Sequence, residues 1–332
     1  MMNKKLIGAA VVSIMLFSCE SPEDKTSADT DEVHHPASQT IPEEAEEFIG
    51  RWDLTLDKEG EEMPSWLEIE LSGFSTLVGR YVSYSGSARP ISHVQLNDEG
   101  EFSFSIPPQW EDSKNNLTVK GYLDGDQLKG TVTAGSGKEY NYVGVKAPLL
   151  IRDSEPEWGE SIELFNGEDL EGWRLSAEKE NWEVVDGVLT NNEAGANLIS
   201  EDTFDDFKLE VEFRYPEGSN SGVYLRGRYE LQIEDSPLDK HPGSLFFGGI
   251  YGFLSPNEMA TLGPNEWQKM EVTLIGRLVT IVANGKEIIT RQEIPGITGG
   301  ALDSREEEPG PIYLQGDHGP VEFKSIKITP SK

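Results

Sequence analysis

The segment Leu209-Glu210-Val211-Glu212-Phe213-Arg214-Tyr215 alternates apolar and charged residues at every step. Successive side chains of a β-strand point to opposite faces of a sheet, so this period of two gathers the apolar side chains on one face and the charges on the other. One face of such a strand packs on a core and the other meets solvent, which is typical of antiparallel sheets. The segment therefore predicts an all-β domain.

Further segments of the C-terminal half have the properties of strands, and Gly, Asn and Pro residues separate them. They cover residues 222–226, 229–233, 269–275, 278–282 and 321–328. No helical period lies between them. Residues 160–330 are therefore predicted to form an antiparallel sandwich of the jelly-roll type, with two curved sheets and one concave face.

Residues 48–147 carry shorter strands with the same period of two, separated by turn sequences such as Asp124-Gly125-Asp126. Such turns join neighbouring antiparallel strands. The pattern predicts a smaller all-β domain and leaves two architectures open, an up-and-down barrel and a two-sheet sandwich. The opening Gly50-Arg51-Trp52 resembles the start of lipocalin-like barrels, which favours the barrel. Residues 147–160 are predicted to be a linker.

The N-terminus has the composition of an export signal, with positive charge in Asn3-Lys4-Lys5 and a short apolar run over residues 6–17. The run ends in Leu16-Phe17-Ser18-Cys19, which resembles a bacterial lipobox and holds the only cysteine of the sequence. Residues 1–19 are therefore predicted to be a lipoprotein signal peptide that is lipidated at Cys19. Residues 20–47, rich in Ser, Thr, Asp, Glu and Pro, are predicted to be a disordered acidic tether.

A lipoprotein of this kind is expected to be exported and anchored at the outer membrane, facing the periplasm or the cell surface. The formal net charge of −32 over 332 residues argues against nucleic acid as a partner, because phosphate binding needs clustered Lys and Arg. The acidic surface also keeps the folded domains away from anionic lipid, so the N-terminal lipid is the expected membrane attachment. The charge by itself says nothing about the substrate.

The C-terminal half also contains an ordered series of short motifs. They are Leu164-Phe165-Asn166-Gly167-Glu168-Asp169-Leu170-Glu171-Gly172-Trp173, Asn220-Ser221-Gly222-Val223-Tyr224-Leu225-Arg226-Gly227, Tyr229-Glu230-Leu231-Gln232-Ile233-Glu234-Asp235, Gly249-Ile250-Tyr251-Gly252, Asn265-Glu266-Trp267, Asn284-Gly285, Gly310-Pro311-Ile312-Tyr313-Leu314-Gln315 and His318-Gly319. In this order they resemble the 3-keto-disaccharide hydrolase (DUF1080) family. The resemblance implies a concanavalin A-like jelly roll that acts on carbohydrate, with a 3-keto-glycoside or 3-keto-disaccharide as substrate.

A ketone at C3 of the sugar changes the chemistry that cleavage requires. The ketone acidifies the C2 hydrogen, so the glycosidic bond at C1 can break by β-elimination before water adds back. This route needs a base for the C2 proton, a proton donor for the leaving oxygen, and donors or a cation facing the enolate oxygen. Glu230 and Glu234 would stand about 13 Å apart on one strand. That separation is too large for the carboxyl pair of ordinary glycosidases, which lie about 5 to 9.5 Å apart.

Alternation places Glu230, Gln232 and Glu234 on one face of their strand, and the resemblance implies that this face lines the sugar cleft. We expect Glu230 to act as the base or as a carboxylate facing a metal ion, His318 as the second acid or base, and Arg226 as the cation near the enolate or sugar oxygens. The structural alternative for Arg226 is an ion pair with Glu230. The expected substrate-binding residues are Gln232, Asn220, Tyr251, Glu234 and Asp317.

Several properties stay open at this stage. Glu230, Asp235, Asp317 and His318 offer ligands for a divalent metal ion, but no compact ligand-spacing motif is present and no cofactor is predicted. A non-catalytic glycan-binding lipoprotein and a structural lipoprotein that contacts other proteins are the alternative functions.

Overall fold

The computed structural model describes residues 43–109 and 111–332. The predicted signal peptide, the lipidation site at Cys19 and the tether up to residue 42 lie outside the described residues. The described residues all belong to one compact unit. No helix in the described ranges is long and apolar enough to cross a membrane. The described chain consists largely of β-strands, which confirms the predicted fold class.

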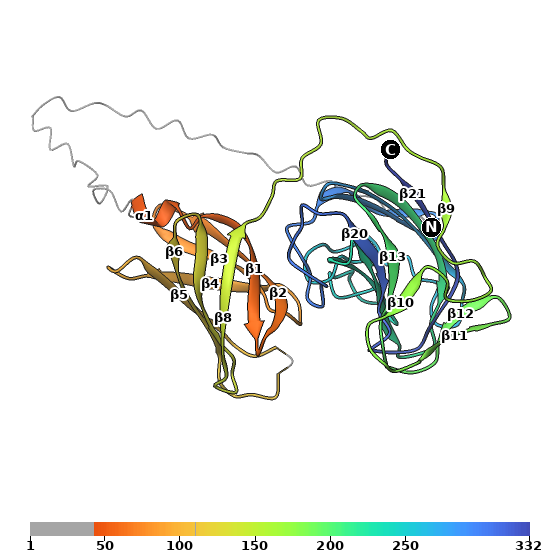
Figure 1. Cartoon of the computed structure of the whole chain (residues 1–332), viewed down its shortest axis with the longest axis horizontal. Coiled ribbons are helices and arrows are strands. Elements are labelled where there is room, and N and C mark those ends of the chain that lie inside the picture. The colour runs from red at the N-terminus through yellow and green to blue at the C-terminus, as the bar shows by residue number, and fades with distance from the viewer. Residues whose placement is uncertain (1–42, 110) are drawn as a thin grey trace, which may run out of the picture. The chain divides into compact units, whose positions relative to one another are not determined.

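Eight antiparallel strands close into a barrel, in which each strand pairs with its neighbour along the chain and β8 pairs with β1 (Figure 1). They are β1 (Gly50–Lys58), β2 (Glu61–Ser72), β3 (Thr76–Val82), β4 (Arg89–Leu96), β5 (Glu101–Ile106), β6 (Leu117–Asp124), β7 (Gln127–Thr133) and β8 (Glu139–Lys146). Alternate residues of β1, among them Trp52, Leu54 and Leu56, belong to the apolar core of the barrel. The up-and-down barrel is therefore confirmed over the two-sheet alternative.

A short helix, α1 (Glu43–Glu46), precedes the barrel inside the stretch that was predicted to be disordered. Ala45 and Phe48 are buried in the barrel core, and the Trp52 indole nitrogen donates a hydrogen bond to the Phe48 carbonyl at 2.8 Å. The ordered chain therefore begins before residue 48. Composition missed this start because one alanine and one phenylalanine hardly change the polar character of the acidic residues around them.

Two antiparallel sheets form the C-terminal sandwich. The smaller sheet has the order β10 (Trp173–Leu175), β13 (Leu198–Phe204), β20 (Gly310–Leu314), β15 (Asn220–Leu225) and β16 (Tyr229–Glu234). The larger has the order β11 (Trp182–Val185), β12 (Val188–Asn191), β21 (Val321–Pro330), β14 (Phe207–Arg214), β17 (Gln268–Ile275), β18 (Leu278–Ala283) and β19 (Lys286–Glu293), and β9 (Ile162–Glu163) pairs with β21. The predicted jelly-roll sandwich is confirmed.

Strand β14 contains most of the alternating segment that predicted this domain. Leu209, Val211 and Phe213 are fully buried in the sandwich core, where each side chain contributes about 1.5–3 kcal/mol by leaving water. On the other face, Glu210 and Glu212 form ion pairs with surface lysines. The charged face is therefore a solvated face, as the alternation predicted.

The barrel packs against two loops of the sandwich. The first, residues 294–309, connects β19 to β20, and we call it the strap. Its Ser304 hydroxyl lies 2.8 Å from the Thr55 hydroxyl of β1. The second loop contains Phe253, whose ring meets the fully buried Trp66 of β2 edge to face at 5.2 Å. Trp66 belongs to the sandwich core, so the two β-domains share part of their apolar packing.

Candidate active site

A cavity of about 320 Å³ lies against β15, β16 and β20. This volume is at the lower end of the range for small-molecule sites, about 300–1,000 Å³. The structure brings six of the expected site residues together in its lining: Asn220, Glu230, Gln232, Tyr251, Asp317 and His318. The even-numbered side chains Glu230 and Gln232 of β16 thus face a hollow of the molecule and not bulk solvent.

The pairing of β15 with β16 explains why these side chains meet. Gly222 lies opposite Gln232, and Tyr224 lies opposite Glu230. A Cβ atom at position 222 would come within 2.7 Å of Glu230 Oε1, so the glycine leaves the space that the carboxyl group occupies. The odd-numbered side chains of β16 pack into the sandwich core. Strand periodicity therefore positions Glu230 and Gln232 on the cavity side.

The Glu230 side chain is buried, with 4% of the residue's surface exposed. Burial raises the pKa of Glu230 to about 8, despite the opposing effects of the Tyr224 hydrogen bond and the His318 charge. The Tyr224 hydroxyl lies 2.9 Å from both Glu230 Oε2 and the Gly299 carbonyl oxygen, yet it has only one proton to donate. A protonated Glu230 satisfies both contacts, because it donates to Tyr224 and Tyr224 donates to Gly299. Geometry and burial therefore both favour a carboxyl group that holds its proton at neutral pH.

His318 lies in the loop after β20, with its Nδ1 atom 2.7 Å from Asp317 Oδ1. This hydrogen bond raises the pKa of His318, against the effect of partial burial, and the charge of Glu230 acts in the same upward direction. Among the described residues that line the cavity, none is a lysine or an arginine. The imidazolium form of His318 is therefore the cationic group that the lining supplies.

Two buried amides offer hydrogen-bond acceptors to a ligand. Gln232 Oε1 and Gln315 Oε1 have no hydrogen-bond partner in the described part of the chain, and both residues line the cavity. An unpaired buried acceptor costs about 1–3 kcal/mol, which a sugar hydroxyl in the cavity would relieve. Gln315 was not among the expected binding residues. Its place at the end of the motif Gly310-Pro311-Ile312-Tyr313-Leu314-Gln315 is the signal that could have found it.

The lining also contains residues that were not among the expected site residues. Tyr224 and Tyr313 stack in parallel, with their ring centroids 4.2 Å apart. Burial raises the pKa of the Tyr224 hydroxyl well above its ordinary value, which keeps it protonated. The barrel contributes Met63 and residues 84–86. No local signal in the barrel sequence connects these residues with a site in the other domain.

Arg226, expected near the sugar, does not line the cavity. It lies in the turn between β15 and β16 with a φ of 53°, which ends the strand alternation that would have placed it beside Tyr224. Its side chain is fully buried and donates to Asp205 Oδ1 at 2.8 Å and to the Tyr229 hydroxyl at 3.0 Å. The expectation for Arg226 is corrected: its side chain is engaged within the fold, and its ion-pair partner is Asp205, not Glu230.

Glu234, expected to bind substrate, also lies outside the lining. Its carboxyl group is half-buried, which raises its pKa, and the neighbouring Gln232 acts in the opposite direction. Gln232 itself donates to Asn220 Oδ1 at 3.4 Å. Glu234 therefore lies beside Gln232 and does not itself face the cavity.

The four side chains considered as metal ligands do not form a metal centre. Throughout residues 43–109 and 111–332, no group of three or more His, Cys, Asp or Glu side chains is placed to hold an ion. Asp235 instead accepts a hydrogen bond from the backbone nitrogen of Gly218 at 2.8 Å, and Asp317 is bonded to His318. We therefore assign no mechanistic step to a metal ion.

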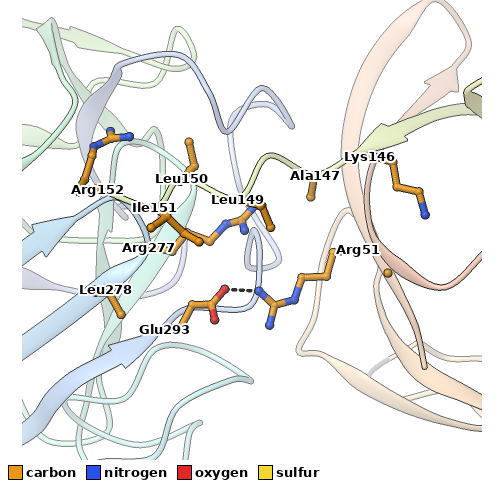
Figure 2. Close-up of a pocket in the computed structure, with 11 residues that line it drawn as sticks. Arg51, Lys146, Ala147, Leu149, Leu150, Ile151, Arg152, Arg277, Leu278 and Glu293 are labelled. Atoms are coloured by element: carbon orange, nitrogen blue, oxygen red, sulfur yellow. Dashed lines mark hydrogen bonds and ion pairs between the residues drawn. The ribbon is translucent and has the colours of Figure 1, made fainter. Parts of the chain in front are cut away.

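A larger hollow of about 670 Å³ lies elsewhere, beside residues 147–152 (Figure 2). All cationic side chains of its lining have partners. Arg51, Arg152 and Arg277 form ion pairs with carboxylates, and Figure 2 shows the pair of Arg51 with Glu293. Lys146 donates to a backbone carbonyl group. The hollow therefore offers mainly apolar surface and no uncommitted charge. The smaller cavity, with its buried carboxyl group and unpaired amides, is the candidate active site.

Comparisons with known proteins identify the family of the C-terminal domain. Residues 160–329 match the model of the 3-keto-alpha-glucoside-1,2-lyase-like domain family. A Parabacteroides distasonis structure with the provisional name glycosyl hydrolase is 26% identical, covers 54% of this chain and 92% of its own, and has a TM-score of 0.45. Another of the same provisional name and organism is 25% identical over 51% and 98%, with a TM-score of 0.41. A GH16 endo-beta-1,3(4)-glucanase is 12% identical over 55% and 94%, with a TM-score of 0.36. No curated protein matches the chain.

Proposed function

Because the chain belongs to the 3-keto-alpha-glucoside-1,2-lyase-like domain family, we propose that it is a glycosidase-type enzyme that cleaves the glycosidic bond of 3-keto-glycosides. The observation that carries the proposal is the buried Glu230 carboxyl group, which shares a cavity with the Asp317–His318 pair. The lining has acidic groups and no lysine or arginine among its described residues. We therefore expect uncharged sugars as substrates, because the one cationic group that the described lining supplies, the imidazolium of His318, is already paired with Asp317.

In the proposed reaction, ionised Glu230 accepts the C2 proton, and the electron pair of the C–H bond forms the enolate of the C3 ketone. The enolate collapses to a C1–C2 double bond as the C1–O bond breaks, and the imidazolium of His318 gives its proton to the departing oxygen. Water then adds to C1 while C2 regains a proton, so the net reaction is hydrolysis. The raised pKa of Glu230 makes its carboxylate a stronger base than an exposed glutamate.

In this scheme, side-chain amides and hydroxyls perform the role that was expected of Arg226, which was to face the enolate or sugar oxygens. Gln232 and Gln315 would bind sugar hydroxyls through their unpaired oxygens. Neutral N–H and O–H donors that face the C3 oxygen would stabilise the enolate, because a preorganised donor in a buried site is worth more than one in water.

We expect the full chain to cleave a 3-keto-glycoside at least about 10²-fold faster than the same glycoside with a hydroxyl at C3, because only the ketone acidifies the C2 hydrogen. Matched pairs such as 3-keto-trehalose with trehalose, or 3-keto-lactose with lactose, give the comparison by initial rates of sugar release. Equal rates on both members of a pair would exclude the elimination route. Tight binding without release would support a glycan-binding module instead.

For the location of the protein, we propose that it is exported and anchored through a lipid on Cys19, as the sequence Leu16-Phe17-Ser18-Cys19 predicts. In bacteria expressing the full chain, labelled palmitate is expected to enter the wild-type protein and not the Cys19→Ser variant. The variant is also expected to leave the membrane fraction. Membrane retention of Cys19→Ser together with unchanged labelling would contradict the anchor.

A further inference from the structure

We propose that the N-terminal barrel is part of the substrate site, where the turn at residues 84–86 closes one side of the cavity and restricts the substrate to a short glycoside. This inference rests on the proposed function and adds a determinant of substrate size to it. Met63 of β2 and Tyr84, Ser85 and Gly86 between β3 and β4 line the same cavity as Glu230.

The barrel turn contacts the strap directly beside the Glu230 network. The Gly300 backbone nitrogen donates a hydrogen bond to the Tyr84 carbonyl at 3.1 Å. A Cβ atom on Gly299 would come within 2.1 Å of the Gly86 carbonyl oxygen, so the two backbones meet without an intervening side chain. The Gly299 carbonyl accepts the hydrogen bond from Tyr224, the partner of Glu230. The barrel is therefore linked to the proposed base through the strap and one tyrosine.

The barrel also supports the loop that carries Tyr251 into the cavity. A Cβ atom on Gly252 would lie 2.7 Å from the Ala88 backbone nitrogen, which shows how closely this loop approaches the barrel. The next residue, Phe253, packs edge to face on the buried Trp66 at an interplanar angle of 86°. Two segments of the sandwich that line the cavity, the strap and this loop, thus rest on barrel residues.

Buried polar contacts hold the strap against both domains. Glu306 of the strap is fully buried and accepts hydrogen bonds from Arg277 at 2.6 and 3.1 Å. Asp53 of β1 is buried beside it, and burial together with the neighbouring Glu306 raises the pKa of Asp53. On the barrel side, the Thr55 hydroxyl of β1 lies 2.8 Å from the Ser304 hydroxyl of the strap. The wall is therefore a packed interface.

This placement sets a size limit on the substrate. Tyr84 is half-buried, and Lys58 Nζ lies 4.7 Å from the centroid of its ring, which holds the ring in position. A glycan chain that extended past the 84–86 turn would meet this ring and the backbone behind it. A single keto-sugar with a small aglycone fits a cavity of about 320 Å³, whereas an internal unit of a polysaccharide would need an opening on both sides.

The test compares kcat/KM for a 3-keto-disaccharide and for a tetrasaccharide oxidised at the same terminal unit, using the full chain. Wild type is expected to prefer the disaccharide by about tenfold or more. Tyr84→Ala is expected to raise KM for the disaccharide about five- to tenfold, to leave kcat largely unchanged, and to remove most of the length preference. Tyr122→Ala, an exposed tyrosine elsewhere on the barrel, serves as the matched control and is expected to behave as wild type.

Ser85→Trp tests the same wall without removing buried packing, since Ser85 is exposed. It narrows the cavity and is expected to lower kcat/KM for both substrates about tenfold or more. An unchanged length preference in Tyr84→Ala, with wild-type kinetics in Ser85→Trp, would overturn the inference while leaving the cleavage reaction intact.

Hydrogen exchange separates the two proposals when neither substrate is cleaved. Absence of cleavage would exclude the proposed reaction. The role of the barrel is then tested by hydrogen exchange of the full chain with bound 3-keto-disaccharide. Saturating ligand is expected to slow exchange at residues 83–87 and at the strap, and Tyr84→Ala is expected to abolish the protection at residues 83–87. Absence of protection there overturns the inference whether or not cleavage occurs.

Discussion

Replacing Glu230 with glutamine is expected to lower the turnover of a 3-keto-glycoside by about 10³-fold, because a positioned general base contributes about 10²–10⁴-fold. Glutamine keeps the size of the side chain, and its amide nitrogen can donate to the Tyr224 hydroxyl as the protonated carboxyl group does, but it cannot take up the C2 proton. The measurement is single-turnover release of free sugar from saturating substrate. In heavy water, the wild type is expected to incorporate deuterium at C2 of the recovered substrate. Glu230→Gln is expected to lose this incorporation together with turnover.

Glu234→Gln is the matched control for this experiment, since Glu234 is on the same strand but outside the cavity lining. It is expected to retain turnover within about threefold of wild type, because it acts on the substrate only through Gln232. Full turnover of Glu230→Gln with an intact fold would remove Glu230 from the mechanism. A loss of equal size in both variants would show that the strand as a whole, and not the Glu230 carboxyl group, had been disturbed.

The Glu230→Gln substitution is also expected to stabilise the folded protein at alkaline pH, by up to about 5 kcal/mol. The pKa of Glu230 rises from 4.5 to about 8 on folding, and each unit corresponds to about 1.36 kcal/mol. The folded protein holds the proton up to about pH 8, whereas the unfolded chain releases it near pH 4.5. The wild type therefore loses stability as the pH rises from about 4.5 to about 8, and the loss is constant above that range.

Urea unfolding of both proteins at pH 4 and pH 9 measures this effect. At pH 9 the unfolding free energy of Glu230→Gln is expected to exceed that of the wild type. At pH 4 this excess is expected to be smaller. Glu70→Gln, at an exposed position of β2, is the control and is expected to change the unfolding free energy by less than about 0.5 kcal/mol at both pH values. A difference that stays the same between pH 4 and pH 9 would show that Glu230 is not held in its protonated form by burial.

Together, these two expectations mean that the buried Glu230 carboxyl group lowers the stability of the protein and raises its reactivity. Desolvation of the Glu230 carboxyl group weakens the fold at alkaline pH, and the same desolvation makes its carboxylate a stronger base. A stabilised but inactive Glu230→Gln variant is the expected signature of such a group. An exposed glutamate on the outer face of the sandwich would show neither effect.

Much of the fold was predictable because strand alternation is a local property of the backbone. The segment at residues 209–215 predicted a face on the core and a charged face, and β14 has both. The turn sequences of residues 48–147 predicted antiparallel neighbours, and the barrel consists of such neighbours throughout. Buried residues just before the barrel were missed, because Ala45 and Phe48 lie in an acidic stretch and their packing partners are distant in sequence.

The candidate site was also predictable only in part. The alternation in β16 predicted that Glu230 and Gln232 share a face, and the ordered motifs pointed to Asp317 and His318, which the fold brings to the same cavity. The sequence alone therefore determined the strands, their faces and most of the chemical groups, because these depend on neighbouring residues. Two features could be seen only in the folded molecule: Arg226 turns away to Asp205, and barrel residues line the cavity. A single left-handed residue ends strand alternation, and contacts between distant segments depend on packing that no local pattern records.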